Sequence, residues 1–358
     1  MAAGRRDAER DGLPSAGGRH GALRVGPVLA IPAVLADLGV APERVFRLAG
    51  VDLQLFQDPE NRVPLESIGR LFEVCVALTG CRHFGLLVGE RFDLNAFGAI
   101  GDLMRHSATV GDALRDLLLH LHLHDRGGAP LLLGPDAGSV VLGYSIYHEQ
   151  RIPAAAQIHA TATTVAYRIL RELCGPAFEP LVVRFAYDRP GDAAEYRRLY
   201  QSAVAFDAAT SGVTFASSWL SHSLQGADPR RHRELAQAIR AAAGTRPISF
   251  AERLEGVINQ ALLGGTASEP DVARRLAIHE RTMRRRLRAE GTSFRKLVNE
   301  TRFELACQLL RNRRLPVTEI AAVLQYADPN AFSRAFRTWS NRSPKDWRAR
   351  SPARPEHP

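Results

Sequence analysis

The pattern that most constrains this chain occurs twice in its last hundred residues: two short amphipathic helices on either side of a tight turn. The first copy is SEPDVARRLAIHERTMRRRLRAEG, in which Ser268 followed by Asp271 marks a helix start and Pro270 occupies its permitted first turn. A break at residues 277–280 precedes the second helix. The residues that face inward at helical spacing are Val272, Ala273, Leu276, Met283 and Leu287. This arrangement predicts a helix-turn-helix unit.

The second copy is LPVTEIAAVLQYADPNAFSRAFRTWS, which repeats the plan. Residues 326–328 form the turn, Asp328 caps the next helix, and Pro329 stands at its first position. The inward residues are Val317, Ile320, Ala321, Leu324, Phe332 and Phe336. A second helix-turn-helix unit is therefore predicted.

One long amphipathic helix over 293–313 joins the two units, and another helix over 248–263 precedes them, its start marked by Ser249 and Glu252 as a capping box. A helix of about 20 residues is about 30 Å long. Successive major grooves on one side of B-DNA recur at about 34 Å. A rigid connection of that length would hold two recognition helices in adjacent major grooves, so that one monomer covers two turns.

The positive charge of the chain is confined to the same region. Residues 250–350 hold 20 Lys and Arg against 11 Asp and Glu, whereas residues 1–249 hold 26 of each sign, so the whole net charge of +9 resides near the C-terminus. A localised excess of this kind is typical of proteins that bind a polyanion. Charge alone leaves open a merely solvated basic surface.

The region before residue 226 mixes helical and strand patterns, which predicts an α+β domain. Helices are expected over 31–40, 42–51, 64–80, 110–125, 154–173 and 192–201, and strands over 129–135, 139–149, 180–188 and 212–220. The expected fold class is an α+β N-terminal domain, followed by an all-α domain with two helix-turn-helix units joined by a long helix.

Composition sets the domain boundaries. We expect disordered tails at 1–25 and 351–358, a regulatory domain over 26–225, a helical linker over 226–247 and the DNA-binding domain over 248–350. No run approaches the roughly 18 apolar residues that span a bilayer, and the arginine-containing N-terminus has no apolar segment of the kind found in secretion signals. A cytoplasmic protein without a membrane partner is expected.

Motifs for metal, cofactor or catalytic chemistry are missing from the sequence. The four cysteines form no CxxC pair and are expected to be buried: Cys75, Cys81, Cys174 and Cys307. Among His120, His122 and His124, only the first and last share a face of a helix, so no metal site is expected. Without a GxSxG elbow, a P-loop or a GxGxxG turn, neither an enzyme nor a cofactor is expected.

Over residues 250–350 the chain is similar to the AraC/XylS family of transcription regulators. The stretches VARRLAIHERTMRRRLRAEGTSFRKLVNETRFELACQLL and VTEIAAVLQYADPNAFSRAFRTWSNRSPKDWR carry the resemblance. IPAVLADLGVAPERVFRLAGVD, FGLLVGERFDLNAFGAIGDLMRHSATVGDALR and VTFASSWLSHSL resemble the arabinose-binding type N-terminal domain of regulators of ornithine, quinate or lipid metabolism. Its name does not imply arabinose here. Together the two similarities cover about residues 27–350.

The resemblance implies which residues contact DNA. Base contacts fall on the outer faces of the two recognition helices, at Arg281, Arg284, Arg285, Pro329, Asn330, Ser333 and Arg334. Arginine can bond guanine bidentately, and asparagine can bond adenine. Phosphate contacts fall on Lys296, Arg302, Arg337, Arg342 and Lys345.

The resemblance also implies partners: double-stranded promoter DNA, RNA polymerase, an unknown small-molecule effector and, in a homodimer, a second copy of the chain. Activation is the commoner role in the family, and repression is the alternative. A DNA-repair methyl-acceptor protein is another alternative, since such proteins carry a similar DNA-binding unit. Cys75 and Cys81 stand in an apolar helix, which does not suit the reactive thiolate that this chemistry requires.

The chain departs from the family at both turns. The family usually has glycine where this chain has Ala277 and Gln325, and we expect a left-handed backbone at those positions to cost about 1 kcal/mol each. His279 replaces the usual capping serine, so a weaker start of the first recognition helix is expected.

Overall fold

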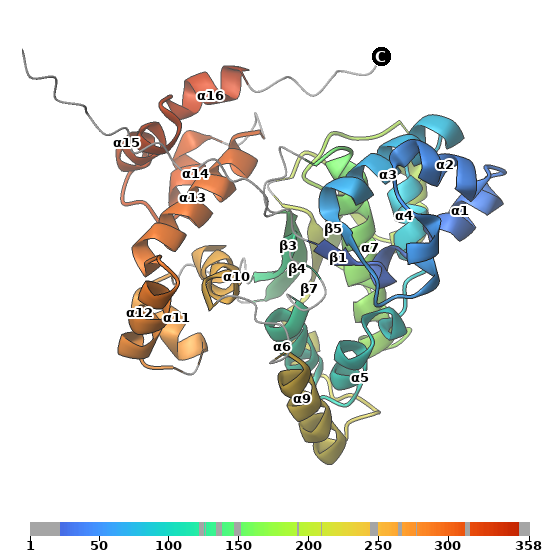
Figure 1. Ribbon diagram of the computed structural model, residues 1–358, viewed down its shortest axis with the longest axis horizontal. Helices are drawn as coiled ribbons and strands as arrows, with labels where there is room; N and C mark the ends of the chain where they lie inside the picture. The colour runs from blue at the N-terminus through green and yellow to red at the C-terminus, as the bar shows by residue number, and fades with distance from the viewer. Residues whose placement is uncertain are drawn as a thin grey trace, which may run out of the picture.

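The computed structural model describes residues 22–121, 125, 127–133, 138–146, 152–191, 193–208, 210–243, 250–263, 267–276, 278–311 and 316–350. An α+β N-terminal part (residues 22–243) is followed by an all-helical C-terminal part (residues 250–350), and the two lie side by side in Figure 1. Among the described residues, the buried side chains of the two parts form separate clusters. The predicted fold class is confirmed.

The N-terminal part begins with a small helical layer. Strands β1 (Ala22–Arg24) and β2 (Arg62–Pro64) pair antiparallel below helices α1 (Ile31–Asp37), α2 (Pro42–Ala49), α3 (Leu65–Thr79) and α4 (Phe84–Glu90). Phe46 and Phe56 meet edge to face at 4.8 Å between ring centroids, and both are buried. The helices predicted here are confirmed, whereas α4 was not predicted.

A five-stranded sheet forms the other layer of this part, in the order β3–β4–β7–β5–β6. The strands are β3 (Gly128–Leu133), β4 (Ser139–Ile146), β7 (Gly212–Ala216), β5 (Val182–Arg184) and β6 (Ala203–Ala205). Only the β5–β6 pair among these is parallel. Strands β3 and β4 correspond to the strands predicted over 129–135 and 139–149 and pair antiparallel, and β6, with three residues, was not predicted.

The long helix α7 (Ala155–Cys174) packs between this sheet and α4. Two glycines of α4 permit the close approach. A Cβ atom at Gly85 would lie 2.3 Å from the carbonyl oxygen of Gln157, and one at Gly89 would lie 2.5 Å from Cβ of Thr164. Side chains at these positions would force α7 away, because buried backbone atoms cannot move as a flexible side chain does.

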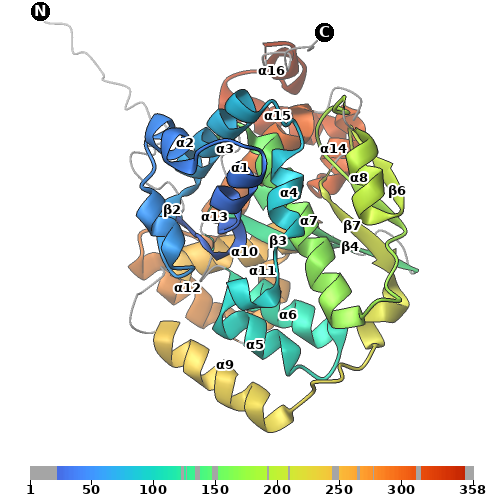
Figure 2. The same ribbon diagram turned by 90° about the vertical axis from the view of Figure 1, so that its right-hand side faces the viewer.

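Helices α5 (Ala99–Arg105), α6 (Val110–His120) and α8 (Ala193–Tyr200) complete the N-terminal part, and α9 (Pro229–Ala243) runs below α5 and α6 (Figure 2). Helix α9 covers most of the predicted linker. It packs on α5, places Leu235 and Ile239 in the N-terminal core, and brings Nε2 of His232 within 2.7 Å of Oδ2 of Asp116 in α6. The helix is therefore attached to the N-terminal part; the domain boundaries themselves stay predictions.

The C-terminal part contains the helices α10 (Phe250–Leu263), α11 (Glu269–Arg275), α12 (Glu280–Ala289), α13 (Phe294–Arg311), α14 (Val317–Val323), α15 (Pro329–Ser340) and α16 (Pro344–Arg350). Their order agrees with the predicted one, and α16 is an additional helix of seven residues at the end. Across the described ranges, no single helix has both the length and the apolar composition to cross a bilayer; α3 and α4 reach it only as a pair bent by 111°.

Candidate functional site

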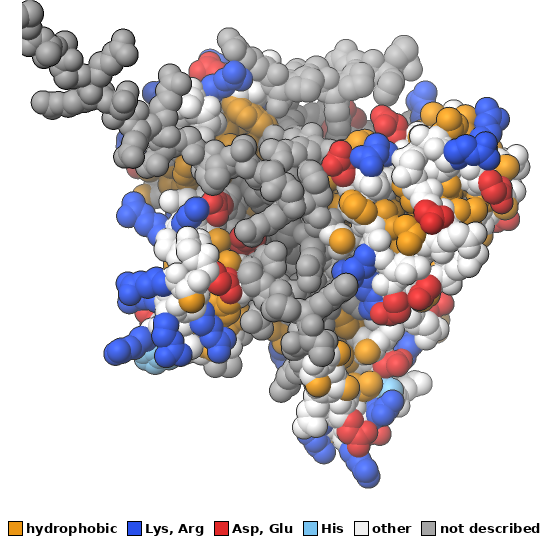
Figure 3. Space-filling model, viewed as in Figure 1, with side chains coloured by type: hydrophobic (Ala, Val, Ile, Leu, Met, Phe, Trp, Pro, Cys, Tyr) orange, Lys and Arg blue, Asp and Glu red, His pale blue; other side chains and the backbone are white. Residues whose placement is uncertain are grey.

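The two helix-turn-helix units lie at opposite ends of α13, and α12 and α15 both lie on the side that faces away from the N-terminal part (Figure 1). With 18 residues, α13 is about 27 Å long at about 1.5 Å per residue. Figure 3 shows Lys and Arg side chains gathered along this edge of the molecule. The spacing and the charge together suit two neighbouring grooves of a polyanionic duplex.

Helix α12 is the second helix of the first unit, anchored by the buried side chains of Met283 and Leu287. Its N-cap is His279, whose Nδ1 accepts a hydrogen bond from the backbone N–H of Arg281 at 3.2 Å. The imidazole therefore makes the capping hydrogen bond that a serine makes elsewhere.

The arginines predicted to reach bases from α12 are all exposed, but they differ in their partners. Nε of Arg284 lies 2.7 Å from Glu269 of α11, and its Nη2 lies 3.4 Å from Glu280. Within the described ranges, Arg281 and Arg285 have no ion-pair partner. The guanidinium of Arg284 thus connects the two helices of the unit, while those of Arg281 and Arg285 face solvent.

Helix α15 is the second helix of the second unit. Asp328 accepts a hydrogen bond from the backbone N–H of Ala331 at 2.8 Å, and Pro329 stands in the first turn, so the predicted start is confirmed. Asn330 and Arg334 are exposed. Ser333 and Pro329 are half-buried on the same helix.

Most residues predicted to contact phosphates are also exposed: Lys296, Arg337, Arg342 and Lys345. Arg337 and Arg342 line one shallow depression between α15 and α16. Arg302 is different. Its guanidinium carbon lies 4.9 Å from the ring centroid of Tyr326, so this half-buried side chain supports the turn of the second unit.

Gln325 has the left-handed backbone expected for the usual glycine position, with φ +59°. Its side chain reaches across to the first unit. Nε2 donates to the carbonyl oxygens of Ala261 and Leu262 at 3.0 and 2.6 Å, and Oε1 accepts from the N–H of Ala267 at 3.3 Å. The residue thus binds the turn of the second unit to the end of α10. The other departure, Ala277, lies outside the described residues.

Replacing Gln325 by alanine is expected to lower the free energy of unfolding by about 1–3 kcal/mol, because the bonds to α10 are lost and the left-handed backbone remains. Glycine at this position loses the same bonds but relieves the backbone, so its variant should be about 1 kcal/mol more stable than the alanine variant. Urea unfolding of the full chain measures both. A glycine variant more stable than the parent by more than about 1 kcal/mol would mean that the side-chain bonds contribute nothing.

A second long-range contact in this part was also not predicted. The carboxylate of Glu290, just after α12, accepts hydrogen bonds from the N–H groups of Phe250 and Ala251 at 2.6 and 2.8 Å. An anion therefore caps the first turn of α10. The expected capping box cannot be compared with this contact, since Ser249 and the side chain of Glu252 lie outside the described residues.

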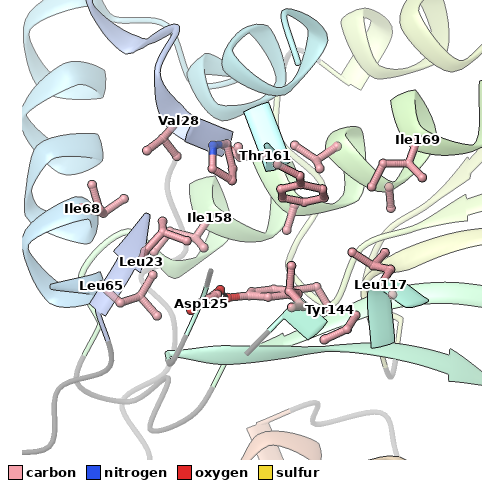
Figure 4. Close-up of a pocket in the computed structure, with 18 of the residues that line it drawn as sticks. Leu23, Val28, Leu65, Ile68, Leu117, Asp125, Tyr144, Ile158, Thr161 and Ile169 are labelled. Atoms are coloured by element: carbon pink, nitrogen blue, oxygen red, sulfur yellow. Dashed lines mark hydrogen bonds between the residues drawn. The ribbon is translucent and has the colours of Figure 1, made fainter. Parts of the chain in front are cut away.

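The N-terminal part contains a cavity between α7 and the sheet, closed at one end by α3 and β1. Figure 4 shows side chains from these elements and from α6 converging on it. The lining is Leu23, Pro27, Val28, Leu65, Ile68, Phe72, Phe97, Leu117, Leu121, Asp125, Pro130, Leu142, Gly143, Tyr144, Ile158, Thr161, Ala162, Val165, Ala166 and Ile169. The space open to the centre of a water molecule is about 80 Å³, well above the roughly 10–15 Å³ that one water needs.

Among the described residues of this lining, Asp125 is the one carboxylic acid, and it is buried. Its Oδ1 accepts from the N–H of Gly127 at 2.7 Å, and its Oδ2 accepts from the hydroxyl of Tyr144. Burial raises the pKa of the Asp125 carboxyl to about 6, against the opposing effects of the Tyr144 hydroxyl, the backbone N–H groups of Gly127 and Gly128, and the charge of Arg62. Sequence reasoning missed this acid, because only the fold brings it to Tyr144.

Asp125 makes stability depend on pH. Its folded-state pKa lies above its unfolded value, so its contribution is complete below about pH 4 and is lost as pH rises through about 6. We expect the free energy of unfolding of the parent protein to fall by about 2–3 kcal/mol between pH 4 and pH 7 relative to Asp125→Asn. Paired urea titrations at several pH values measure this difference. A difference that stays constant over the range would contradict the assignment.

Cys75 and His120 lie in surroundings that do not suit thiol or metal chemistry. Burial raises the pKa of the Cys75 thiol to about 12, which leaves it protonated and unreactive at neutral pH. His120 accompanies no cluster, because the described residues contain no group of three potential metal ligands. His122 and His124 lie outside the described residues.

Comparison with known proteins divides the chain in the same way. A family model described as the arabinose-binding domain of AraC transcription regulator, N-terminal, matches residues 39–224, and a helix-turn-helix domain model matches residues 272–350. The ornithine utilization regulator of Pseudomonas aeruginosa is 27% identical over 320 residues, which cover 88% of this chain and 93% of that protein. The HTH-type transcriptional regulator VirS of Mycobacterium tuberculosis is 26% identical over 322 residues, with coverage of 88% and 93%. The crystal structure of the transcriptional regulator CdpR from Pseudomonas aeruginosa aligns at a TM-score of 0.45 and 24% identity over 89% of this chain and 96% of that one.

Proposed function

Because this chain belongs to the AraC family of transcription regulators, we propose that it reads promoter DNA through both helix-turn-helix units and activates transcription when its N-terminal part binds a small molecule. One observation carries the proposal: α12, which bears exposed arginines, and α15, which bears exposed Asn330 and Arg334, lie at opposite ends of α13 on the same side of the molecule (Figure 1). That arrangement matches successive major grooves on one side of a duplex.

The side chains proposed to contact bases differ in the base that each can bond. Arg281 and Arg285 present guanidinium groups that can bond guanine, and the amide of Asn330 can bond adenine. Arg334 extends from α15 toward the same groove, with Ser333 and Pro329 beside it. Arg284 orients α12 through Glu269 rather than reading a base, as long as that ion pair persists on DNA.

Phosphate contacts are proposed for the cations around the two recognition helices: Lys296, Arg337, Arg342 and Lys345. Arg302 contributes through the turn that it supports at Tyr326. Contacts to phosphates position the protein and make affinity depend on salt, without reading sequence.

In this proposal the effector acts on the DNA-binding units through two contacts of the cavity wall, one between β3 and α10 and the other between α6 and α9. Strand β3 supplies Pro130 to the cavity, and the same strand lies against α10 of the C-terminal part (Figure 1). Helix α6 supplies Leu117, and its neighbour Asp116 bonds His232 of α9. A ligand that prefers one arrangement of β3 and α6 would shift how the DNA-binding units are presented.

Activation through RNA polymerase is the direction that we propose, since it is the commoner role in the family that the chain resembles. Promoter DNA as the partner implies action in the bacterial cytoplasm. A symmetric dimer would extend the site to two copies.

The test is binding of the full chain to the DNA upstream of its own gene and of the neighbouring genes, at two salt concentrations, with a reporter gene placed behind any fragment that binds. We expect one fragment to be retained selectively, more weakly at the higher salt, and reporter expression to fall when the regulator gene is deleted. Equal, weak retention of every fragment would contradict sequence-specific reading. A reporter that rises on deletion would identify a repressor.

A further inference from the structure

We infer that the effector is a predominantly apolar small molecule that ends in a single hydrogen-bond donor, such as an alcohol or an amine, held in the cavity between α7 and the sheet. The inference names the chemical class of the effector and in that respect rests on the proposed function. It excludes sugars and free amino acids as ligands of this cavity.

The walls of the cavity are mostly apolar. Side chains of Leu23, Ile68, Phe72, Leu142 and Ile169 face the cavity, and nearly all of the remaining lining is likewise aliphatic or aromatic. A hydroxyl or ammonium group placed against such walls loses its bonds to water and gains none, so each such group weakens binding. A molecule with four or five polar groups would lose most of its binding free energy, whereas a hydrocarbon chain or ring would gain from burial.

The carboxyl and phenol groups of the cavity wall are concentrated at one place. Asp125 and Tyr144 meet where β1 and β4 border the cavity, and Figure 4 shows the Tyr144 ring along its floor with the hydroxyl directed at Asp125. Thr161, the other polar side chain there, bonds the carbonyl oxygens of Gly85 and Gln157, each at 2.9 Å. Among the described lining residues, one polar end of a ligand therefore finds a partner, and a second does not.

The carboxylate of Asp125 determines which polar head group of a ligand can bind beside it. A carboxylate accepts hydrogen bonds and donates none, and it has room for about four. Gly127, Gly128 and Tyr144 occupy three of these positions, which leaves one, and the phenol oxygen can itself accept while it donates. A donor on the ligand is therefore bound, whereas a carboxylate head group would meet a buried acid of the same sign.

The cavity is narrow. The space open to the centre of a water molecule is about 80 Å³, which is room for more than one water molecule. A slender hydrocarbon chain therefore suits this space.

The test uses the full chain and the fluorescent apolar probe N-phenylnaphthylamine, displaced in turn by decanol, decylamine, decanoate, ornithine and arabinose. We expect decanol and decylamine to displace the probe, decanoate to need at least a tenfold higher concentration, and ornithine and arabinose to have no effect. Displacement by decanoate as readily as by decanol, or by either polar compound, would overturn the inference.

Two variants locate the site. Ala166→Phe fills the cavity from α7 and should abolish displaceable binding, whereas Ala36→Phe, the same change at an exposed position of α1, should leave it intact. Asp125→Asn should weaken decylamine at least tenfold and decanol much less, because only the amine loses a charge partner. This second variant and the ligand series on the parent protein remain decisive if Ala166→Phe does not fold. Equal binding by Ala166→Phe and the parent would overturn the assignment to this cavity.

DNA binding by the same preparations, without ligand, separates the two proposals. If neither decanol nor decylamine displaces the probe, the inferred effector class is wrong, and selective DNA binding in that preparation leaves the proposed function standing. If decanol binds in the cavity but no DNA fragment is retained, the cavity inference holds and the DNA-reading proposal fails.

Discussion

Replacing Phe336 by alanine is expected to lower the free energy of unfolding of the C-terminal part by about 3–5 kcal/mol and to remove sequence-specific DNA binding. The Phe336 ring is fully buried, with ring centroids of Phe303, Phe332 and Trp347 at 5.6, 5.7 and 6.1 Å. It thereby connects α15 to α13 and α16. Loss of the ring leaves a cavity where α15 packs against α13 and α16. Because α15 is one of the two proposed recognition helices, its displacement should abolish base contacts by the second unit.

Urea unfolding followed by tryptophan fluorescence measures this change, since Trp339 and Trp347 both lie against the same core. The neighbouring exposed residue supplies the matched control. Arg337→Ala should alter the free energy of unfolding by no more than about 0.5 kcal/mol, while weakening DNA binding and its dependence on salt. A loss below about 1 kcal/mol for Phe336→Ala would show that the second unit is held by other contacts.

Replacing Arg281 and Arg285 together by alanine is expected to weaken specific DNA binding by about 2–6 kcal/mol, because each bidentate contact to a base contributes about 1–3 kcal/mol of discrimination. Both guanidinium groups are exposed on α12. Binding to unrelated DNA should fall far less, since it depends on the many phosphate contacts that remain. Titration of a selected fragment against an unrelated one of the same length measures both affinities.

Arg284→Ala is the control for this experiment. Because Arg284 is paired with Glu269, its loss should reduce affinity much less than the loss of Arg285, and Glu269→Gln should have a similar small effect. If Arg284→Ala weakens specific binding as much as Arg285→Ala does, Arg284 leaves its partner on DNA and reads a base. If the double variant binds as the parent does, α12 is not a reading helix.

Local signals account for what could be predicted from the sequence. Ser268 and Asp328 cap α11 and α15 as their positions indicated, because a cap depends only on the three residues that follow it. The inward residues of both units repeat at helical spacing, and Met283 and Phe332 are buried accordingly. The strand β6, with three residues, has no periodicity to detect.

The contacts that could not be predicted join residues far apart in the chain. Gln325 and Ala261 are 64 positions apart, and Glu290 and Phe250 are 40 apart. No spacing rule connects such pairs, because only the packed fold decides which side chains meet. The same reason hid the meeting of Asp125 with Tyr144, and with it the polar end of the cavity.

Exposure of the proposed DNA contacts followed from helical periodicity, but their partners did not. Arg281, Arg284 and Arg285 look alike in the sequence, and only the structure separates the paired Arg284 from the other two. Arg302 was expected at a phosphate, and the structure places it over Tyr326. A basic side chain can therefore stand where a phosphate contact is expected and also pack against an aromatic ring of the same protein.

The central claim is that both units read DNA at once, and hydroxyl-radical footprinting of the full chain on a selected fragment tests it most directly. The account predicts two protected segments on one face of the duplex, with centres about one helical turn, or about 34 Å, apart, and loss of one segment each in Arg285→Ala and Arg334→Ala. A single protected segment that disappears in only one of these variants would contradict it, and would mean that one of the two units does not enter a groove.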